Sequence, residues 1–479
     1  MLFPTVAFAV FFCIAFLANW LLRPTLRVWL VVMTGMSLVF YGWTDPRFVW
    51  LLAGSALTNW AFGEGVARSL GPEGERTPRS TNVLRAAVAA NLVFLGFFKY
   101  YGFFVDSFAE ALDIVGIGLT PPVLQVFLPV GISFFTFHAI SYVIDIGRGT
   151  IRPMPLGDFC LYLSFFPHLV AGPIVRASEF APQIRRRADP RDVPAGEAFR
   201  LIAGGLFKKV VISSFLASEL VDPVFGAPGA HGRWELVIGV YAYAVQIYAD
   251  FSGYTDIAIG CALLLGIRFP QNFNAPYRAL SLQDFWRRWH MTLSRWLRDY
   301  LYIPLGGSRD GPGRTYVNLF LTMLLGGLWH GAAGHFLVWG AIHGGFLAAE
   351  RRVKEWWTAT STEPVLPGVV SRSLQWLLTF HIVCLAWIFF RADSLGTAFD
   401  VIDGIVGSAQ PNALVTTLVL ITIALSIASQ FVPPRVADAA GDRFATLAPG
   451  FQVLGLAAAL TLIDVLGPDG VAPFIYFQF

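Results

Sequence analysis

Residues 234–265 read WELVIGVYAYAVQIYADFSGYTDIAIGCALLL and form one long, mostly apolar run. About 20 apolar residues are enough for a helix to cross a bilayer, so this run predicts a membrane-spanning helix. The runs Val6–Leu22, Val28–Trp43 and Leu414–Phe431 have the same character. Because a helix satisfies its own backbone hydrogen bonds in lipid, we expect an all-α integral membrane protein with many spans.

The composition favours a membrane protein over a set of soluble domains. Hydrophobic residues make up 56% of the 479 residues, and charged residues only 14%. A soluble chain of this length cannot bury so much apolar surface. The four cysteines show no paired spacing, so neither a disulfide framework nor a zinc site is predicted. The first twenty residues hold no Lys or Arg, which predicts a retained helix rather than a secretory signal.

We expect a single membrane domain over residues 1–479, with about 11–12 transmembrane helices. The expected spans lie near residues 4–22, 27–43, 47–67, 84–105, 124–147, 197–221, 234–265, 315–331, 335–350, 373–391, 413–432 and 450–467. The stretch 156–173 is short and bounded by Pro and Gly, so it is expected to be re-entrant rather than to cross.

The basic residues are concentrated in alternate loops of this predicted topology. Of the 34 Lys and Arg residues, 30 lie in the loops 23–27, 68–85, 148–152, 176–209, 268–314, 351–372 and 435–443. Cytoplasmic loops of membrane proteins carry an excess of Lys and Arg. The sequence therefore predicts that these loops are cytoplasmic and that both termini lie outside.

The segment 268–314 differs from an ordinary loop. It contains FWRRWHMTLSRWLRDYLYIPLGG at 285–307, with aromatic residues and leucines at helical spacing. Four arginines lie between them: Arg287, Arg288, Arg295 and Arg298. Ser281 predicts an N-terminal cap and Pro304 a stop, so we expect one amphipathic helix in the cytoplasmic interface. An interfacial anchor explains the tryptophans and arginines, but it gives no reason for His290 in the middle.

Among the histidines, His330 has the most unusual surroundings. It lies in LLGGLWHGAAGHFLVWGAIHGG (324–345) and ends an apolar run, which predicts a place inside the membrane or at its outer rim. The small residues around it allow another backbone or a substrate to approach closely. An ionisable residue at this depth predicts a functional site. Other histidines are expected in the core (His138, His168, His381) or in solvent (His231).

Two rival kinds of chemistry fit the histidines less well. His330, His335 and His343 are separated by five and eight residues, which is not the i, i+4 spacing of helical zinc ligands. No acidic residue lies between Asp310 and Glu350, so no metal site is expected. The sequence has no G-x-S-x-G elbow for a nucleophilic serine. General-base chemistry by a neutral imidazole at His330 fits best, and the role of His335 stays open.

Several motifs together resemble the membrane-bound O-acyltransferases, above all the bacterial alginate O-acetyltransferase branch, which also includes the teichoic-acid D-alanyltransferase. They are DFSGYTDIAIG (250–260), FPQNFNAPY (269–277), the segment 285–307 and LWHGA (328–332), extended by GISFFTFHAISYVID (131–145) and FFPHLVAGPI (165–174). The resemblance covers most of the chain from about Leu128 to Phe390, and the order of the motifs is specific.

The resemblance implies a ring of helices around a thin central funnel. An acyl thioester would enter from the cytoplasm and an acceptor hydroxyl from outside. The family's catalytic histidine corresponds to His330, and a second motif histidine corresponds to His290, which would orient or polarise the thioester carbonyl. Relatives commonly have Trp after WHGA-x, whereas this chain has Gly334 and then His335. That departure predicts a wider outer funnel and leaves the acceptor geometry open.

The chain ends APFIYFQF (472–479), beyond the last predicted span, so residues 450–479 are expected to form an exiting helix and an exterior tail. A lone tyrosine here would ordinarily be an interfacial aromatic residue. The tail, however, is similar to an F-x-Y-x-x-F-like motif of the same branch, fitted by Phe474, Tyr476 and Phe479. The resemblance implies that Tyr476 carries the acyl group between donor and acceptor.

Together with this resemblance, the sequence predicts an O-acyltransferase of the bacterial inner membrane that acetylates an extracytoplasmic polysaccharide. The donor is expected to be acetyl-CoA, reached through the segment Arg287–Arg298, with no bound cofactor or metal. The expected partners are membrane lipid and a separate extracytoplasmic transferase, with no nucleic acid. A lipid O-acyltransferase with the same base is one alternative, and a transporter is another, although no repeat halves are visible. The acyl group, the polysaccharide and the oligomeric state stay open.

Overall fold

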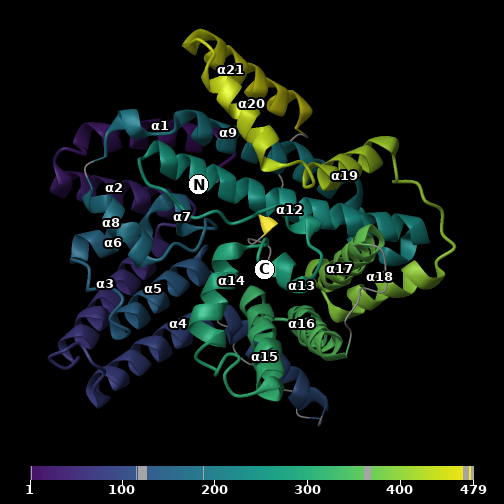
Figure 1. The fold of residues 1–479 in the computed structure, drawn as a ribbon, viewed down its shortest axis with the longest axis horizontal. Helices are drawn as coiled ribbons and strands as arrows, with labels where there is room; N and C mark the ends of the chain where they lie inside the picture. The colour runs from purple at the N-terminus through teal and green to yellow at the C-terminus, as the bar shows by residue number, and fades with distance from the viewer. Residues whose placement is uncertain are drawn as a thin grey trace. The chain divides into compact units, whose positions relative to one another are not determined.

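The computed structural model describes residues 1, 3–114, 116, 127–186, 188–360, 368–467 and 474–475, and within these ranges the regular secondary structure is entirely helical (Figure 1). The chain separates into two compact units. Unit 1 comprises Met1–Ala198 and Ala258–Pro270, and unit 2 comprises Phe199–Ile257 and Gln271–Phe479. The all-α prediction is confirmed, whereas the ring around a central funnel stays a prediction.

Unit 1 is built from the N-terminal helices. They are α1 (Val6–Leu22), α2 (Leu26–Gly42), α3 (Arg47–Arg68), α4 (Pro78–Ile114), α5 (Ile132–Gly147), α6 (Leu156–Ser164), α7 (Phe166–Leu169) and α8 (Ala177–Arg185). The side chain of Trp29 on α2 is fully buried, and its indole N–H donates to Asn19 Oδ1 on α1 at 2.9 Å. The predicted re-entrant stretch forms α6 and α7, which are too short to cross a bilayer.

Unit 2 holds most of the remaining helices. They are α9 (Ala195–Leu206, starting in unit 1), a π-helical segment Phe207–Ser213, α10 (Ser214–Leu216), a π-helical turn Ala217–Val221, α11 (Asp222–Gly226), α12 (Arg233–Leu264, ending in unit 1), α13 (Leu282–Trp286), α14 (Met291–Leu297), a π-helical turn Arg298–Tyr302, α15 (Pro312–His330), α16 (Gly334–Thr360), α17 (Gly368–Arg391), α18 (Leu395–Gly407), α19 (Thr417–Ser429), α20 (Pro434–Ala445) and α21 (Pro449–Leu466). Short 3₁₀ turns lie at Pro190–Asp192, Pro228–Ala230 and Pro276–Arg278.

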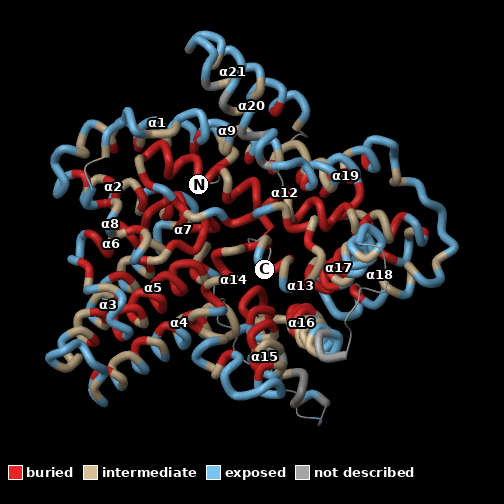
Figure 2. The backbone as a smooth tube through the Cα atoms, viewed as in Figure 1, coloured by how far each residue is buried: buried red, intermediate tan, exposed pale blue. Residues whose placement is uncertain are grey.

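The helices have the length and surface of a multi-pass membrane protein. Pro78–Val105, Ala195–Gly226 and Gly368–Arg391 are long and apolar enough to cross a membrane, and five further apolar helices are shorter. Large apolar side chains such as Trp50 and Val369 are 79% exposed, as expected for a surface that faces lipid. In Figure 2, most of α21 is exposed, whereas the central turns of α12 are buried.

The long helix α12 carries three carboxylates, each of which is paired. Its 32 residues extend about 48 Å, enough to span a bilayer. Glu235 accepts from His231 at 2.8 Å, Asp256 pairs with Lys208 at 2.5 Å, and Asp250 pairs with Lys209. The turn around His231 predicted a solvated side chain. That prediction is wrong, because the ring is hydrogen-bonded to Glu235 and only 13% exposed.

Parts of the predicted organisation are wrong. The single helix expected after Ser281 is interrupted, because His290 has a φ of 39° and left-handed backbone cannot continue a helix. The cap itself is confirmed, since the Ser281 hydroxyl accepts from the Asp284 N–H at 3.0 Å. Segments expected to be loops form α8, α18 and α20. For α18 the signal was present in Ser394, whose side chain accepts from the N–H of Thr397.

Candidate active site

The site is built on the antiparallel pair α15 and α16, which lie side by side in Figure 1. Glycines allow the two backbones to touch. A Cβ on Gly327 would lie 2.2 Å from the carbonyl oxygen of Phe336, and one on Gly340 would lie 2.5 Å from that of Met323. The close approach predicted from the small residues around His330 is therefore an approach of helix to helix.

His330 is the last residue of α15 and is only 5% exposed. Three aromatic rings meet its imidazole edge-on, with centroid distances of 4.8 Å to Trp329, 5.0 Å to Trp339 and 5.1 Å to Phe390. The chain then leaves the helix at Gly331 in an extended conformation. This arrangement fixes the ring and keeps bulk water away from it, which suits a reaction that competes with hydrolysis.

A chain of contacts connects His330 to residues of the preceding segment. Trp339 also lies 4.8 Å from the ring of His343, which is fully buried. The indole N–H of Trp286 donates to Nδ1 of His343 at 3.3 Å. Nε2 of His343 therefore carries the proton, and within the described part of the chain nothing accepts from it. The sequence predicted no catalytic role for Trp286 or Trp339, and it raised His343 only as a possible metal ligand.

His335 and Gly334 mark the departure from the family pattern. Nδ1 of His335 donates to the carbonyl oxygen of Phe389 at 2.9 Å, so this buried ring joins α16 to α17. A Cβ on Gly334 would meet the side chain of Leu395 at 3.2 Å. The space beside Gly334 is thus occupied by α18 rather than left open.

His290 is buried between α13 and α14, where its backbone breaks the helix. Its Nδ1 lies 3.1 Å from Oδ1 of Asn272, which also accepts from the N–H and hydroxyl of Thr292. Because Oδ1 can only accept, Nδ1 carries the proton and Nε2 is an acceptor. Burial lowers the pKa of His290 to about 3, so the ring is neutral. An acceptor at Nε2 suits a base better than a group that polarises a carbonyl.

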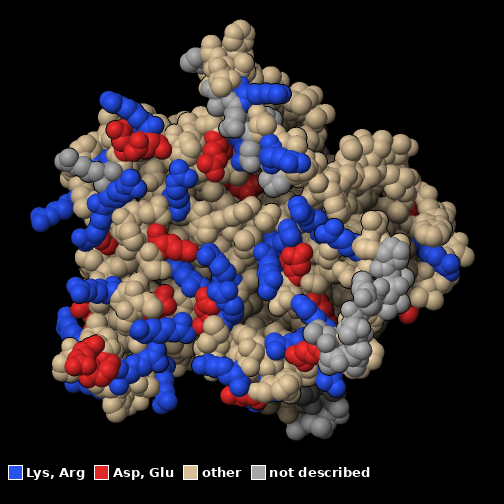
Figure 3. Space-filling view, in the orientation of Figure 1, with Lys and Arg blue, Asp and Glu red and all other residues tan. Residues whose placement is uncertain are grey.

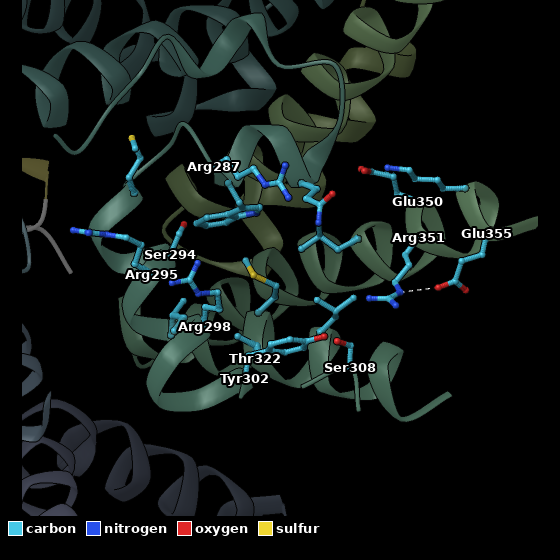
Figure 4. Close-up of a pocket in the computed structure, with 18 residues that line it drawn as sticks. Arg287, Ser294, Arg295, Arg298, Tyr302, Ser308, Thr322, Glu350, Arg351 and Glu355 are labelled. Carbon is cyan, nitrogen blue, oxygen red and sulfur yellow. Dashed lines mark hydrogen bonds and ion pairs between the residues drawn. The ribbon is translucent and has the colours of Figure 1, made fainter. Parts of the chain in front are cut away.

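A cavity of about 1000 Å³ lies between the broken segment and the α15–α16 pair. Arg287, Arg295 and Arg298 line it from one side and Arg351 and Lys354 of α16 from the other, as Figure 4 shows for the arginines, with Arg295 at the edge of the view. Trp286 and Met323 are also in its wall. Met323 precedes His330 by seven residues on α15, or about 10 Å along the helix.

The cavity is lined by five basic and two acidic side chains, and both acids already have partners. Glu350 accepts from the Leu282 N–H at 2.8 Å, which ties α13 to α16. Glu355 accepts from Arg351 at 2.8 Å and from Tyr316 at 2.5 Å. In contrast, no described residue accepts from the exposed guanidinium of Arg287. Figure 3 shows blue side chains gathered over α13–α16.

Arg288 is the one predicted donor-side arginine that does not line this cavity. It forms an ion pair with Asp284 at 2.8 Å, donates to the carbonyl of Asn274 and lines a separate pocket with Arg372 and Trp376. Arg287 and Arg288 follow the last residue of α13, so the predicted continuous helix does not place them on one face. The sequence did not predict that Arg351 and Lys354 line the same cavity. They lie near the end of α16, about 50 residues after the segment that carries the other arginines.

The remaining predicted residues fall outside this site. Tyr476 lies outside the described residues. His168 is buried as predicted and bonds to the carbonyl oxygen of Tyr162. The core position predicted for His381 is wrong, because its ring is exposed, where it bonds to the carbonyl oxygen of Leu377. His138 is fully buried, yet neither of its ring nitrogens has a hydrogen-bond partner among the described residues. No described group of His, Cys, Asp and Glu residues is arranged to hold a metal ion.

Comparison with known proteins assigns this arrangement to a family. The model of the membrane-bound O-acyltransferase family, MBOAT, matches residues 130–391. The probable alginate O-acetylase of Pseudomonas aeruginosa is 44% identical over 367 residues, which cover 76% of this chain and 67% of the relative. The peptidoglycan O-acetyltransferase of Helicobacter pylori is 36% identical over 417 residues (80% and 74%), and the teichoic acid D-alanyltransferase of Bacillus subtilis is 26% identical over 279 residues (54% and 68%). The chain belongs to the membrane-bound O-acyltransferase family and is an O-acyltransferase.

Proposed function

We propose that this enzyme transfers an acetyl group from cytoplasmic acetyl-CoA to a polysaccharide outside the inner membrane, with His330 as the general base. The relatives named as alginate O-acetylase and peptidoglycan O-acetyltransferase support a polysaccharide as acceptor. The observation that carries the proposal is the basic cavity whose wall includes α15, the helix that ends in the buried His330.

The lining of the cavity supports a phosphate-bearing thioester as donor. Coenzyme A carries several phosphate groups, and arginine binds phosphate through paired N–H donors. The cavity volume of about 1000 Å³ is at the upper end of the range for small-molecule sites. Arg287 supplies positive charge with no acidic partner among the described residues, whereas Arg298 and Arg351 pair with Asp299 and Glu355. Trp286 and Met323 supply apolar surface for the thioester arm.

The chemistry assigned to His330 is proton removal from the acceptor hydroxyl. As the proton moves to the imidazole, the hydroxyl oxygen attacks the thioester carbonyl, a C–O bond forms and the C–S bond breaks. The coenzyme A thiolate leaves and takes up the proton. A positioned base contributes roughly 10²–10⁴-fold to such a transfer. The surrounding aromatic rings exclude water, the competing acceptor.

In the relay version of this reaction, the first acceptor is the phenol of Tyr476. The acetyl group would then pass from the aryl ester to the sugar hydroxyl, through a separate extracytoplasmic transferase. The burial of the neighbouring residues Phe474 and Ile475 within unit 2 supports access of the tail to the protein interior. Tyr476→Phe tests the relay, because it removes only the hydroxyl. Undiminished polysaccharide acetylation by that variant would refute the relay but not the acetyl transfer.

The donor is tested by comparing acetyl-CoA with acetyl-pantetheine, which lacks the nucleotide and its phosphates. We expect wild-type kcat/KM to be at least about tenfold higher for acetyl-CoA, since hydrogen bonds to charged groups are strong. Arg287→Gln should lower the ratio of kcat/KM for acetyl-CoA to kcat/KM for acetyl-pantetheine. Arg288→Gln is the matched control, because Arg288 is the adjacent arginine but lines a different pocket. Equal use of both donors by the wild type would contradict the proposed role of the cavity.

The function and orientation are tested in cells that lack the native gene. Wild-type protein should restore ester-linked acetate on the envelope polysaccharide, measured by NMR of the isolated polymer, and His330→Gln should not. Acetate found on lipid instead would favour a lipid O-acyltransferase, and no thioester turnover would favour a transporter. A cysteine at position 298 should react with a thiol reagent only from the cytoplasmic side, with both termini accessible from outside.

A further inference from the structure

The last described residues of the chain are buried within unit 2. Phe474 is 1% exposed and Ile475 is 4% exposed. The ring of Phe474 stacks on Tyr254 of α12 at a centroid distance of 4.4 Å. The backbone N–H of Ile475 donates to Oδ2 of Asp250 at 2.9 Å. These two residues of the tail, which the sequence predicts to be exterior, are thus held against the middle of α12.

The carboxylate that holds the tail is itself held in place. Oδ1 of Asp250 accepts from the ammonium of Lys209 and lies 3.4 Å from the Ser213 hydroxyl, while Oδ2 binds the tail. The side chains of Asp250 and Lys209 are 3% and 2% exposed. Asp250 lies about 26 Å along α12 from its first residue, near the middle of a helix that the sequence predicts to span the membrane. A buried ion pair adds little net stability, and ionisable residues at this depth usually serve function.

The anchoring elements are also shaped for this contact. Lys209 belongs to the π-helical segment Phe207–Ser213, and π-helical turns often occur at functional sites. The end of α21 packs against the same segment, where a Cβ on Gly467 would lie 2.8 Å from Val210. The helix before the tail, α21, therefore contacts the segment that carries Lys209, and the tail residue Ile475 contacts Asp250.

The docked residue Phe474 and the second motif histidine, His290, share one aromatic neighbour. The ring of Phe251 is 5.9 Å from Phe474 and meets the ring of His290 edge-on at 4.7 Å. Phe251 is therefore a shared neighbour of the tail and of His290. Nε2 of His290 has no hydrogen-bond partner among the described residues.

We infer that Asp250, held by Lys209, is a clamp that docks the C-terminal tail inside the protein beside His290. Asp250 and Lys209 are positioning residues, and their function is to deliver Tyr476 to the acyl-transfer site. The delivery rests on the proposed relay, whereas the docking stands on the contacts of Phe474 and Ile475.

The docking is tested by digesting the purified full-length protein with a carboxypeptidase and reading the C-terminus by mass spectrometry. In the wild type, the carboxypeptidase should not remove Ile475 or any residue before it, because a buried residue cannot enter the protease active site. In Asp250→Ala, trimming should pass through Ile475 and Phe474. Asp256→Ala is the matched control, because it breaks the neighbouring pair with Lys208, which is 21–27% exposed, and it should leave the tail protected. Equal trimming beyond Phe474 in wild type and Asp250→Ala would overturn the clamp.

Two double variants distinguish a clamp that holds the tail from an ion pair that only stabilises the fold. They also avoid the unpaired buried charge that could unfold Asp250→Ala. Lys209→Asp with Asp250→Lys restores opposite charges but replaces the acceptor at position 250 with a donor, so the tail should be released. Lys209→Met with Asp250→Asn removes both charges but keeps an amide oxygen, so the tail should stay protected. Protection in the charge swap together with release in the neutral pair would refute the inference.

The two proposals fail in different ways. Tail protection is measured without a donor, so a freely trimmed wild-type tail would refute the clamp whatever the enzyme transfers. Full acetylation by Tyr476→Phe would refute the relay and leave the clamp intact. If both hold, polysaccharide acetylation should fall about 10²-fold in Asp250→Ala and in the charge swap, the loss typical of a misplaced reacting group, and should persist in the neutral pair.

Discussion

Replacing Gly327 with alanine should test how strictly the α15–α16 contact positions His330. The new Cβ would lie 2.2 Å from the carbonyl oxygen of Phe336 and 3.2 Å from the Cα of Gly340. Both neighbours are backbone, so they cannot move aside as a side chain would. Because a carbon and an oxygen need a separation of at least about 3.2 Å, the helices must part by roughly 1 Å.

The consequence for catalysis follows from the position of Gly327, one turn before His330. A displacement of about 1 Å in a reacting group can cost 10²-fold in rate, or about 2.7 kcal/mol in the barrier. The cost in folding should be smaller, about 1–3 kcal/mol, as for other overpacked sites. We therefore expect a folded protein whose kcat for thioester turnover is about 10²-fold lower.

The assay is coenzyme A release from labelled acetyl-CoA by purified protein, with size-exclusion chromatography and thermal unfolding as checks of the fold. Gly345→Ala on α16 is the matched control, since its Cβ would meet nothing within 4 Å. It should keep wild-type activity. If Gly327→Ala turned over within about threefold of the wild type, the reasoning from helix contact to base position would be refuted.

Two further variants probe the residues around this contact. Trp286→Phe removes the N–H donor to His343 and keeps an aromatic ring. We expect kcat to fall about 3–10-fold, which corresponds to the loss of one hydrogen bond, with little change in KM. An unchanged kcat would show that the Trp286–His343 hydrogen bond does not contribute to catalysis. For His290, the folded pKa of about 3 lies below the ordinary value of 6.5, so the unfolded chain binds the extra proton and stability falls as the pH falls between these values. Between pH 7 and pH 5, the free energy of unfolding should fall by about 2 kcal/mol more in the wild type than in His290→Asn, as measured by thermal unfolding. Asparagine is the replacement because it tolerates the left-handed backbone at this position. Equal losses in the two proteins would contradict the burial of a neutral His290 ring.

The sequence predicted the helical class and His330 for reasons that are local. Spans are read from runs of apolar residues, and the WHGA segment carries its glycines beside the histidine. These properties do not depend on distant partners. Gly327, one of the small residues beside His330, confirms that they allow close backbone approach, here by Phe336 and Gly340 of α16.

The features that were missed depend on contacts between distant parts of the chain. The break at His290 is supported by Asn272, 18 residues away, and the tail is held by Asp250, 225 residues before Ile475. Helical periodicity does not encode either contact. The second wall of the basic cavity comes from α16, although the cluster RRVK at 351–354, just after an apolar run, marked it as a candidate for the same face of the membrane.

The central claim is that His330 is the base of an acyl transfer from a thioester. It is tested most directly by incubating purified wild-type protein and His330→Gln with isotope-labelled acetyl-CoA and an acceptor polysaccharide, with donor binding measured separately. We predict that the variant binds the donor as the wild type does and transfers the label at least about 10²-fold more slowly. Transfer at the wild-type rate by a folded His330→Gln protein would contradict the claim.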